Sequence, residues 1–516
     1  FIRVKNKEVF DKEKSQNSKF FLAYFFLWLC YVSFLLIKLN LTDSIESTDS
    51  YFYLKIAELS AEGKKYTNPV YSPGYSWLIV PLLKMGLGLE VSGRIISLLC
   101  GAGTIILTFF LSRKIFPSHR QIPVFSAILL SITPKFVWAS YSTLPYTTAT
   151  FFFLLAIYLS LLARSNNRKL YFFFSFFSGF FIGISYVVRP EMIVGFFVFA
   201  FITRSFRSAI FFAFGFFVSS LPYHIITFQE GNLPSIISKF LGYRLPSYSA
   251  PTVEAFGKKV EEEGFSVFLK KVFEIKKYVL YFAENIHLSH KYAISGLLTP
   301  SLLILMGMGT AYIFKEWEKV KSGIYITLVV IFLWCIFIFP IAIVADYFFI
   351  PILPMLSIIS AFSFELIKKE ENVFSRKNFF SLIFFFFVFS LNVFYFSRPL
   401  YKDEGRRIYK IAGKWLKENF GEKIKGTRIF EPMPFATFYS GGIWVTNPED
   451  ADIWIMSSLD YTTSRGKPEL IIFPNDKIEE FGFAKPITEI RYGKEIIRIF
   501  IPPPKKNTNQ NEQLQK

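Results

Sequence analysis

The first residues able to do chemistry lie in the stretch Ser47–Ala57, directly after the first long apolar segment. If this stretch is helical, Asp49 shares one face with the side chains three, four and seven residues further on. These are Phe52, Tyr53 and Ile56. A carboxylate on an aromatic face at a membrane boundary is placed to meet a lipid-borne substrate. The alternative is that Asp49 caps the start of a surface helix, where aspartate is common.

Two further acids, Asp43 and Glu46, stand six and three residues before Asp49. Three carboxylates at this spacing offer the oxygen ligands that a divalent cation prefers. The alternative is that they are solvated acids or begin the helix, and the stretch holds no Asp-x-Asp pair. The sequence therefore implies no certain cofactor, and it leaves a possible divalent cation open at this place.

An aromatic turn follows at Pro73-Gly74-Tyr75, and an apolar run then leads to Lys84. The Pro-Gly pair marks the turn. The run is too short to cross a bilayer, so it predicts an interfacial or re-entrant segment with an aromatic anchor. A plain loop is the alternative.

The third candidate is Arg189-Pro190-Glu191, which lies between two apolar segments. An ionisable residue at the edge of a bilayer is a functional candidate. The guanidinium of Arg189 can hold a phosphate in bidentate fashion. The alternative is an Arg–Glu pair or a snorkelling arginine. Three other cations are expected on the same side, where they would attend a phosphate: Lys84, His224 and Arg244.

The composition places these residues in a membrane protein. The chain has 516 residues, of which 52% are hydrophobic and 20% aromatic, and its mean hydropathy is +0.37. A soluble domain cannot hide that much apolar surface. The net charge of +19 is explained by basic cytoplasmic loops and anionic lipid, without a nucleic-acid partner. Three cysteines scattered through apolar segments cannot form a disulfide framework or a zinc site.

Apolar runs predict about 11 transmembrane helices within residues 20–397. They lie near 20–40, 91–112, 121–139, 145–163, 170–188, 190–203, 208–228, 297–314, 323–343, 346–367 and 378–397. Every second loop is basic, which places residues 1–19 in the cytoplasm. An odd number of spans then places the C-terminal region outside. The other external segments are 41–90, 140–144, 188–191 and 229–296.

Two external regions are large. Loop 229–296 alternates apolar and basic residues over 264–283, which fits an amphipathic helix on the membrane surface or an ordinary packed helix equally well. Residues 398–503 predict a small α/β domain that starts with a helix over Glu404–Asn419. Its strand-like runs are Lys425–Phe430, Ile453–Met456, Glu469–Phe473 and Ile496–Ile501. The polar tail 504–516 predicts disorder.

Several motifs follow one another in a fixed order along residues 20–400. They are Asp49 with Tyr53, then Pro73-Gly74-Tyr75, Arg94, Arg189-Pro190-Glu191, and Tyr347-Phe348 with Pro351 and Pro354. This order resembles the GT-C glycosyltransferases. It is most similar to the bacterial relatives of the dolichyl-phosphate-mannose protein mannosyltransferases and of the aminoarabinose transferase of lipid A, a resemblance that is glycosyltransferase family 39-like.

The resemblance implies a multi-pass protein of a bacterial or archaeal plasma membrane. It implies transfer of a hexose or pentose from a polyprenyl-phosphate donor to a lipid, glycan or protein acceptor outside the membrane. Asp49 would be the general base. The substrate-binding residues would be Tyr53, Tyr75, Lys84, Arg189, Glu191, His224 and Arg244.

The sequence departs from the family's pattern at three places, Leu144, Ser72 and Asp346, and the first of these keeps a non-catalytic role open. Leu144 stands before Pro145, where many relatives carry an acid. A transporter or flippase of lipid-linked sugars is one alternative, since buried charges also mark transport pathways. A non-catalytic membrane scaffold whose outer domain binds partners is the other.

Overall fold

The computed structural model describes eight ranges of the chain. They are 45–64, 71–164, 168–203, 205–229, 300–338, 346–367, 404–457 and 486–501, without 432, 446, 448–449 and 493–494, together with isolated positions from 22 to 33 and residue 387. Several predicted segments lie wholly or mostly outside these residues. They are the N-terminal segment 1–19, span 20–40, loop 229–296 with its amphipathic stretch, span 378–397, the run Glu469–Phe473 and the tail 504–516.

The chain forms two units. The first, here called the membrane unit, comprises Phe1–Ile37 and Phe52–Arg398. The second, here called the C-terminal unit, comprises Lys38–Tyr51 and Pro399–Lys516. The division falls inside helix α2 (Thr48–Ala61), so the turn that carries Asp49 is grouped with the C-terminal unit.

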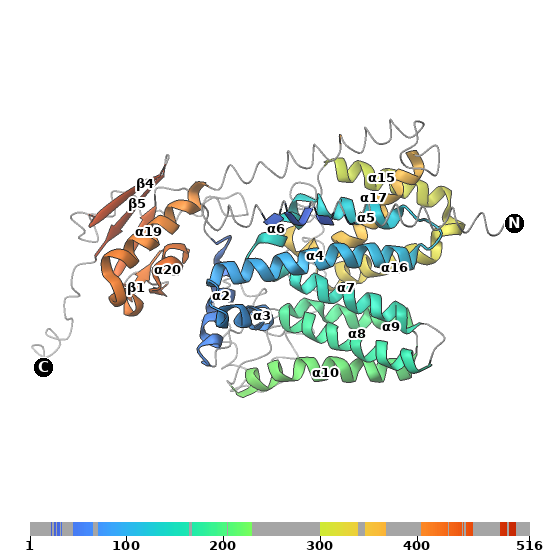
Figure 1. Ribbon diagram of the computed structural model, residues 1–516, viewed down its shortest axis with the longest axis horizontal. Helices are drawn as coiled ribbons and strands as arrows, with labels where there is room; N and C mark the ends of the chain where they lie inside the picture. The colour runs from blue at the N-terminus through green and yellow to red at the C-terminus, as the bar shows by residue number, and fades with distance from the viewer. Residues whose placement is uncertain are drawn as a thin grey trace, which may run out of the picture. The chain divides into compact units, whose positions relative to one another are not determined.

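The membrane unit is built of apolar helices, several of which run side by side, as α7, α8 and α10 do (Figure 1). They are α3 (Gly74–Lys84), α4 (Leu89–Ile115), α5 (Ile122–Ser131), α6 (Pro134–Tyr141), α7 (Tyr146–Ala163), α8 (Arg168–Val188), η1 (Pro190–Val194), α9 (Gly195–Thr203), α10 (Phe206–Gln229), α15 (Pro300–Lys315), α16 (Trp317–Ile338), η3 (Asp346–Ile352) and α17 (Leu353–Ile367). Within the described ranges, six helices are long and apolar enough to cross a membrane, or seven if α5 and α6 form one span bent by 65°. The predicted polytopic helical class is confirmed.

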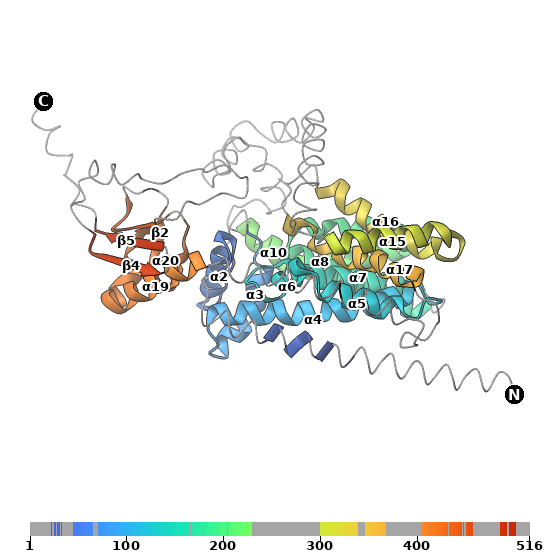
Figure 2. The same ribbon diagram turned by 90° about the horizontal axis from the view of Figure 1, so that it is seen from above.

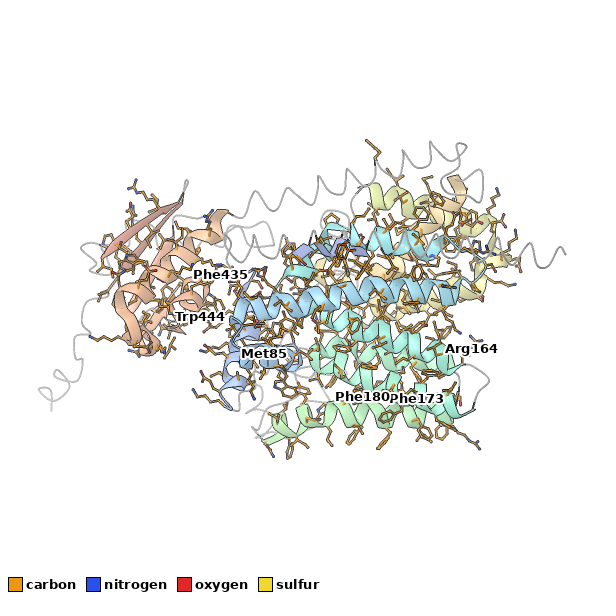
Figure 3. All side chains as sticks on the ribbon, in the orientation of Figure 1. Met85, Arg164, Phe173, Phe180, Phe435 and Trp444 are labelled. Atoms are coloured by element: carbon orange, nitrogen blue, oxygen red, sulfur yellow. The ribbon has the colours of Figure 1, made fainter. Side chains whose placement is uncertain are left out.

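Helices α8 and α10 pack closely because glycines face the opposite backbone. A Cβ atom on Gly179 would overlap the carbonyl oxygen of Phe212, and one on Gly215 would overlap that of Phe176. Small residues allow such close approach of helices in a membrane. Aromatic side chains, including the labelled Phe173 and Phe180, flank this seam (Figure 3). The seam fixes α8, whose end carries the Arg189 turn.

The aromatic turn is fixed against the same end of α8. A Cβ atom on Gly74 would overlap the backbone of Val187, so the start of α3 requires glycine. Tyr75 follows and is fully buried, and its hydroxyl donates to the Gly93 carbonyl of α4 at 2.8 Å. The predicted short apolar run is helix α3, whose 11 residues are too few to cross a bilayer.

In its described residues, the C-terminal unit has a five-stranded mixed sheet, the α-helices α19 (Glu404–Phe420) and α20 (Phe435–Ser440), and the short helix η5 (Gly421–Gly426) (Figure 2). Its strands are β1 (Arg428–Phe430), β2 (Ile443–Val445), β3 (Ile453–Ser457), β4 (Thr488–Tyr492) and β5 (Glu495–Phe500). The strand order is β2-β1-β3-β5-β4; β1 pairs in parallel with β2 and β3, and β5 pairs antiparallel with β3 and β4. Helix α19 packs on β4, β5 and α20. It buries an apolar stripe with a period of four: Ile408, Ala412 and Leu416.

The predicted α/β character of this unit is confirmed. Helix α19 and strands β1, β3 and β5 lie where the sequence patterns predict them, within a few residues. Helix α20 and strands β2 and β4 were not predicted, because three to six residues are too few for a clear periodicity.

Candidate active site

Arg189 lies in the turn that ends helix α8. Proline disfavours the helical conformation in the residue before it, and Arg189 is extended, with φ −144° and ψ 115°. Its Nε and Nη2 atoms donate to Oε2 and Oε1 of Glu191, each at 3.3 Å. Arg189 is 6% exposed and Glu191 1% exposed. The Arg–Glu pair that the sequence left as an alternative is therefore formed, and it is buried.

Two aromatic rings lie against the guanidinium of Arg189. Its central carbon is 4.6 Å from the centre of the Tyr146 ring and 5.1 Å from that of the Phe348 ring. Such contacts stabilise a buried cation through the negative faces of the rings. Tyr347 stacks on Tyr146 with the ring centres 5.0 Å apart. The Tyr347-Phe348 motif therefore forms a wall of the Arg189 site.

Tyr146 reaches this place because the turn before it is tied to helix α4. Arg94 donates to the Tyr141 carbonyl at 2.9 Å, and Ser97 donates to the Leu144 carbonyl at 3.1 Å. Arg94 is itself neutralised by Glu90 at 2.9 Å. Leu144 itself is buried, and its backbone carbonyl holds the turn that leads to Tyr146.

The tyrosines of the first external region join the same cluster. Tyr53 is 4% exposed, and its ring lies edge-on to Tyr71 and Tyr75, with centres 5.4 and 5.8 Å apart. The Tyr53 backbone carbonyl accepts a hydrogen bond from Ser76 at 2.6 Å. The Tyr53 side chain is near enough to Arg189 for the two to interact electrostatically. The structure thus brings together four of the predicted substrate-binding residues, which are Tyr53, Tyr75, Arg189 and Glu191.

Asp49 is the second residue of helix α2 and the acid of its first turn, and its side chain is half-buried. The residue before the helix, Ser47, accepts a hydrogen bond from the Ser50 amide at 3.3 Å. That bond is the usual N-cap interaction, so Ser47 fills the capping position that the alternative interpretation gave to Asp49. Glu46 accepts a hydrogen bond from the Ser50 hydroxyl at 3.2 Å and so acts at the start of the helix.

The remaining predicted residues lie apart from this cluster or outside the described ranges. Lys84 is the exposed last residue of α3, at the other end of that helix from Tyr75. His224 lies in α10, where its ring stacks on Tyr186 at 5.6 Å. Arg244 and Asp43 lie outside the described residues. Among the residues that are described, no group of three His, Cys, Asp or Glu side chains could hold a metal ion.

Sequence reasoning missed two parts of this site. Tyr146 was not singled out, although an aromatic residue directly after Pro145 at the start of a span was a usable signal. Glu90 was also missed, and its spacing of four residues from Arg94 predicts an ion pair on one helix face. The contact between Arg189 and Phe348 joins residues far apart in the sequence, so no local pattern could reveal it.

Comparison with known proteins identifies related sequences and folds. Residues 69–224 match a family described as dolichyl-phosphate-mannose-protein mannosyltransferase. The matched range runs from the aromatic turn through Arg189 and Glu191 to His224. No curated protein matches the chain.

Solved structures that resemble the chain include the following two. ArnT from Cupriavidus metallidurans bound to undecaprenyl phosphate has a TM-score of 0.55 and 10% identity, over 93% of this chain and 97% of that one. AglB, the oligosaccharyltransferase of Archaeoglobus fulgidus in complex with an inhibitory peptide and a dolichol-phosphate, has a TM-score of 0.50 and 12% identity over 83% of this chain. The chain spans only 65% of the length of AglB. The protein therefore has the GT-C fold that the ordered motifs predicted.

Proposed function

We propose that this protein is an integral membrane glycosyltransferase that moves a sugar from a polyprenyl-phosphate donor to an acceptor outside the membrane. The observation that carries the proposal is the likeness of nearly the whole chain to ArnT bound to undecaprenyl phosphate. The match of residues 69–224 to a family of lipid-phosphate-sugar transferases supports it independently. The acceptor class is a lipid, a glycan or a protein, and the sugar is a hexose or a pentose.

The chemistry requires few side chains, because a polyprenyl phosphate is already a good leaving group. A hydroxyl or amine of the acceptor attacks the anomeric carbon, and the bond from that carbon to the phosphate oxygen breaks. The acceptor loses its proton to a base, and the polyprenyl phosphate leaves with the electron pair. We assign the base to Asp49, as the resemblance implies. A direct displacement of this kind inverts the anomeric centre.

The departing phosphate gains charge, so a fixed cation beside it lowers the barrier. We assign this cation to Arg189, because of its place in the chain and because Glu191, Tyr146 and Phe348 hold its side chain rigidly. An arginine has five N–H donors, and its two bonds to Glu191 leave others for a phosphate oxygen. Glu191 then orients the guanidinium. Tyr53 and Tyr75 belong to the same cluster and would contact the substrate.

Lys84, His224 and Arg244 stay weaker members of this proposal. Lys84 and His224 lie on other parts of α3 and α10, and Arg244 lies outside the described residues. A divalent cation near Asp49 also stays a proposal.

The test is sugar transfer by membranes that carry Asp49→Asn at the wild-type protein level. The donors are radiolabelled polyprenyl-phosphate hexoses and pentoses, supplied as a panel. We expect a loss of about 100-fold or more, the effect of removing a general base. The matched control is Glu58→Gln on the same helix, where Glu58 pairs with Lys55 at 2.7 Å near the surface. Undiminished transfer by Asp49→Asn would remove Asp49 from the mechanism. Flipping of the donor in proteoliposomes without transfer would favour the flippase alternative.

A further inference from the structure

The segment that leads to Asp49 packs within the C-terminal unit rather than with the rest of helix α2. Residues Lys38–Tyr51 group with Pro399–Lys516, and the membrane unit resumes at Phe52. The residues on both sides of Asp49 are buried, with Ile45 0% exposed and Tyr51 8% exposed. Asp49 lies between these two anchors, four residues after one and two residues before the other.

Both anchors rest on one small surface, formed by helix α20 and the neighbouring strand β2. The Ile45 amide donates to the Tyr439 hydroxyl at 2.9 Å. The Tyr51 ring lies edge-on to Phe438 and Trp444, with ring centres 6.4 and 6.1 Å apart. Edge-to-face aromatic pairs at such distances are favourable and directional. Trp444 is labelled in the C-terminal unit in Figure 3.

This surface is itself held rigidly. The Glu431 carboxylate accepts hydrogen bonds from the Ala436 and Thr437 amides at 3.1 and 2.6 Å, which fixes the start of α20. The Trp444 indole donates to the Glu431 carbonyl at 2.9 Å. Helix α20 also packs closely on α19, where a Cβ atom on Gly413 would overlap the Ala436 carbonyl oxygen. A rigid support of this kind is what an accurately placed catalytic group needs.

We propose that helix α20 and Trp444 form a positioning clamp that sets the place of the Asp49 carboxylate. The clamp residues are Phe438, Tyr439 and Trp444, and the clamped residues are Ile45 and Tyr51. None of the three clamp residues touches the substrate; they act through Asp49. The inference rests on the proposed function, because it gives the C-terminal unit a role in that reaction.

Two variants disrupt the clamp in different ways. Tyr439→Phe removes the hydroxyl that accepts from the Ile45 amide, and Phe438→Ala removes one ring that meets Tyr51. Phe438→Tyr keeps that ring and is the conservative rescue. The matched control is Trp415→Ala, which removes an aromatic contact with Phe420 elsewhere in the C-terminal unit.

The first measurement is hydrogen exchange of the peptide that covers residues 44–52 in the purified full-length protein. Tyr439→Phe should speed exchange of the Ile45 amide about tenfold, which is the effect expected from the loss of one hydrogen bond. The second measurement is transfer from the same donor panel. A displacement of about 1 Å in a catalytic group can lower the rate about 100-fold. Tyr439→Phe and Phe438→Ala should therefore lower kcat by up to about 100-fold. KM for the donor and binding of undecaprenyl phosphate alone should not change.

Each other outcome overturns the clamp. Unchanged exchange over residues 44–52 would show that α20 does not hold the segment. Faster exchange with an unchanged kcat would show that Asp49 does not depend on it. An equal loss of kcat in Trp415→Ala would show a general weakening of the C-terminal unit. Asp49→Asn is measured beside them. If it abolishes transfer while the clamp variants do not, the clamp fails and the proposed function stands; if Asp49→Asn is fully active, the proposed base fails first.

Discussion

A buried ion pair in the membrane unit and an exposed one in the C-terminal unit show how differently the two units use charge. Arg94 and Glu90 are 2.9 Å apart, with side chains 1% and 9% exposed. Arg428 and Asp452 are also 2.9 Å apart, but each side chain is 44% exposed. The distance is the same, so the surroundings decide the energetic weight of each pair. A buried charge that loses its partner is costly, whereas an exposed one is rehydrated.

The buried pair also has a structural role that the exposed pair lacks. Arg94 donates a hydrogen bond to the Tyr141 carbonyl. The chain continues from there through Leu144 and Pro145 to Tyr146, whose ring lies beside Arg189. Arg428 and Asp452 instead join the start of β1 to the residue before β3, and the Asp452 carboxylate also accepts from the Arg428 amide. A change in the membrane unit should therefore reach the candidate site, while the surface change should stay local.

The largest effect is expected for Arg94→Met, which removes the cation paired with the buried Glu90. Breaking a buried pair in this way costs about 3–5 kcal/mol. We expect a much lower unfolding midpoint in SDS titration of the detergent-purified protein, together with lower transfer activity. The double variant Arg94→Met/Glu90→Leu removes both charges and should recover most of the stability. A midpoint equal to wild type for the single variant would contradict the comparison.

The next effect is expected for Gly215→Leu, in the seam between α8 and α10. The new side chain has no room beside the Phe176 backbone, and overpacking costs about 1–3 kcal/mol and sometimes more. The same SDS titration measures it. The matched control is Gly307→Leu on α15, because a Cβ atom there meets nothing within 4 Å. Equal midpoints for the two leucine variants would show that the close approach of α8 and α10 does not set the stability of the membrane unit.

The C-terminal unit also buries a titratable carboxyl group, that of Glu431, and its pH dependence tests the comparison between the two units. Burial raises the pKa of the Glu431 carboxyl from 4.5 to about 7, although the hydrogen bonds from Thr437 and Ala436 oppose the rise. The folded state therefore keeps a proton that the unfolded state releases, and stability falls as the pH rises from about 4.5 to about 7.

Hydrogen exchange of residues 428–445 in the full-length protein, corrected for intrinsic rates, measures this dependence. We expect faster corrected exchange at pH 8 than at pH 5 in the wild type. Glu431→Gln cannot titrate, so its corrected exchange should be the same at both pH values. A wild type without pH dependence would mean that Glu431 keeps its ordinary ionisation.

The difference between the two units also explains which features of the structure could be predicted from the sequence. The spans follow from long apolar runs, so α4, α7 and α10 begin and end within three residues of their predicted bounds. Arg189, Glu191 and Tyr75 could be named as candidates because charge and turn residues stand out beside such runs. The contact of Tyr51 with Phe438 was out of reach, since it joins residues almost 400 positions apart. Helix α20 could not be predicted, because its six residues are too few to show a helical period and its position depends on the buried Glu431.

The smallest effect is expected for Arg428→Ala at the surface of the C-terminal unit. Exposed pairs gain little, because water solvates both partners nearly as well when they are apart. The unfolding midpoint should therefore stay at the wild-type value, and transfer should be unchanged. Because the Asp452 carboxylate keeps its bond from the Arg428 backbone amide, the junction of β1 and β3 retains one of its links in this variant. A midpoint as low as that of Arg94→Met would mean that exposure does not separate the two pairs, and the difference drawn between the two units would fail.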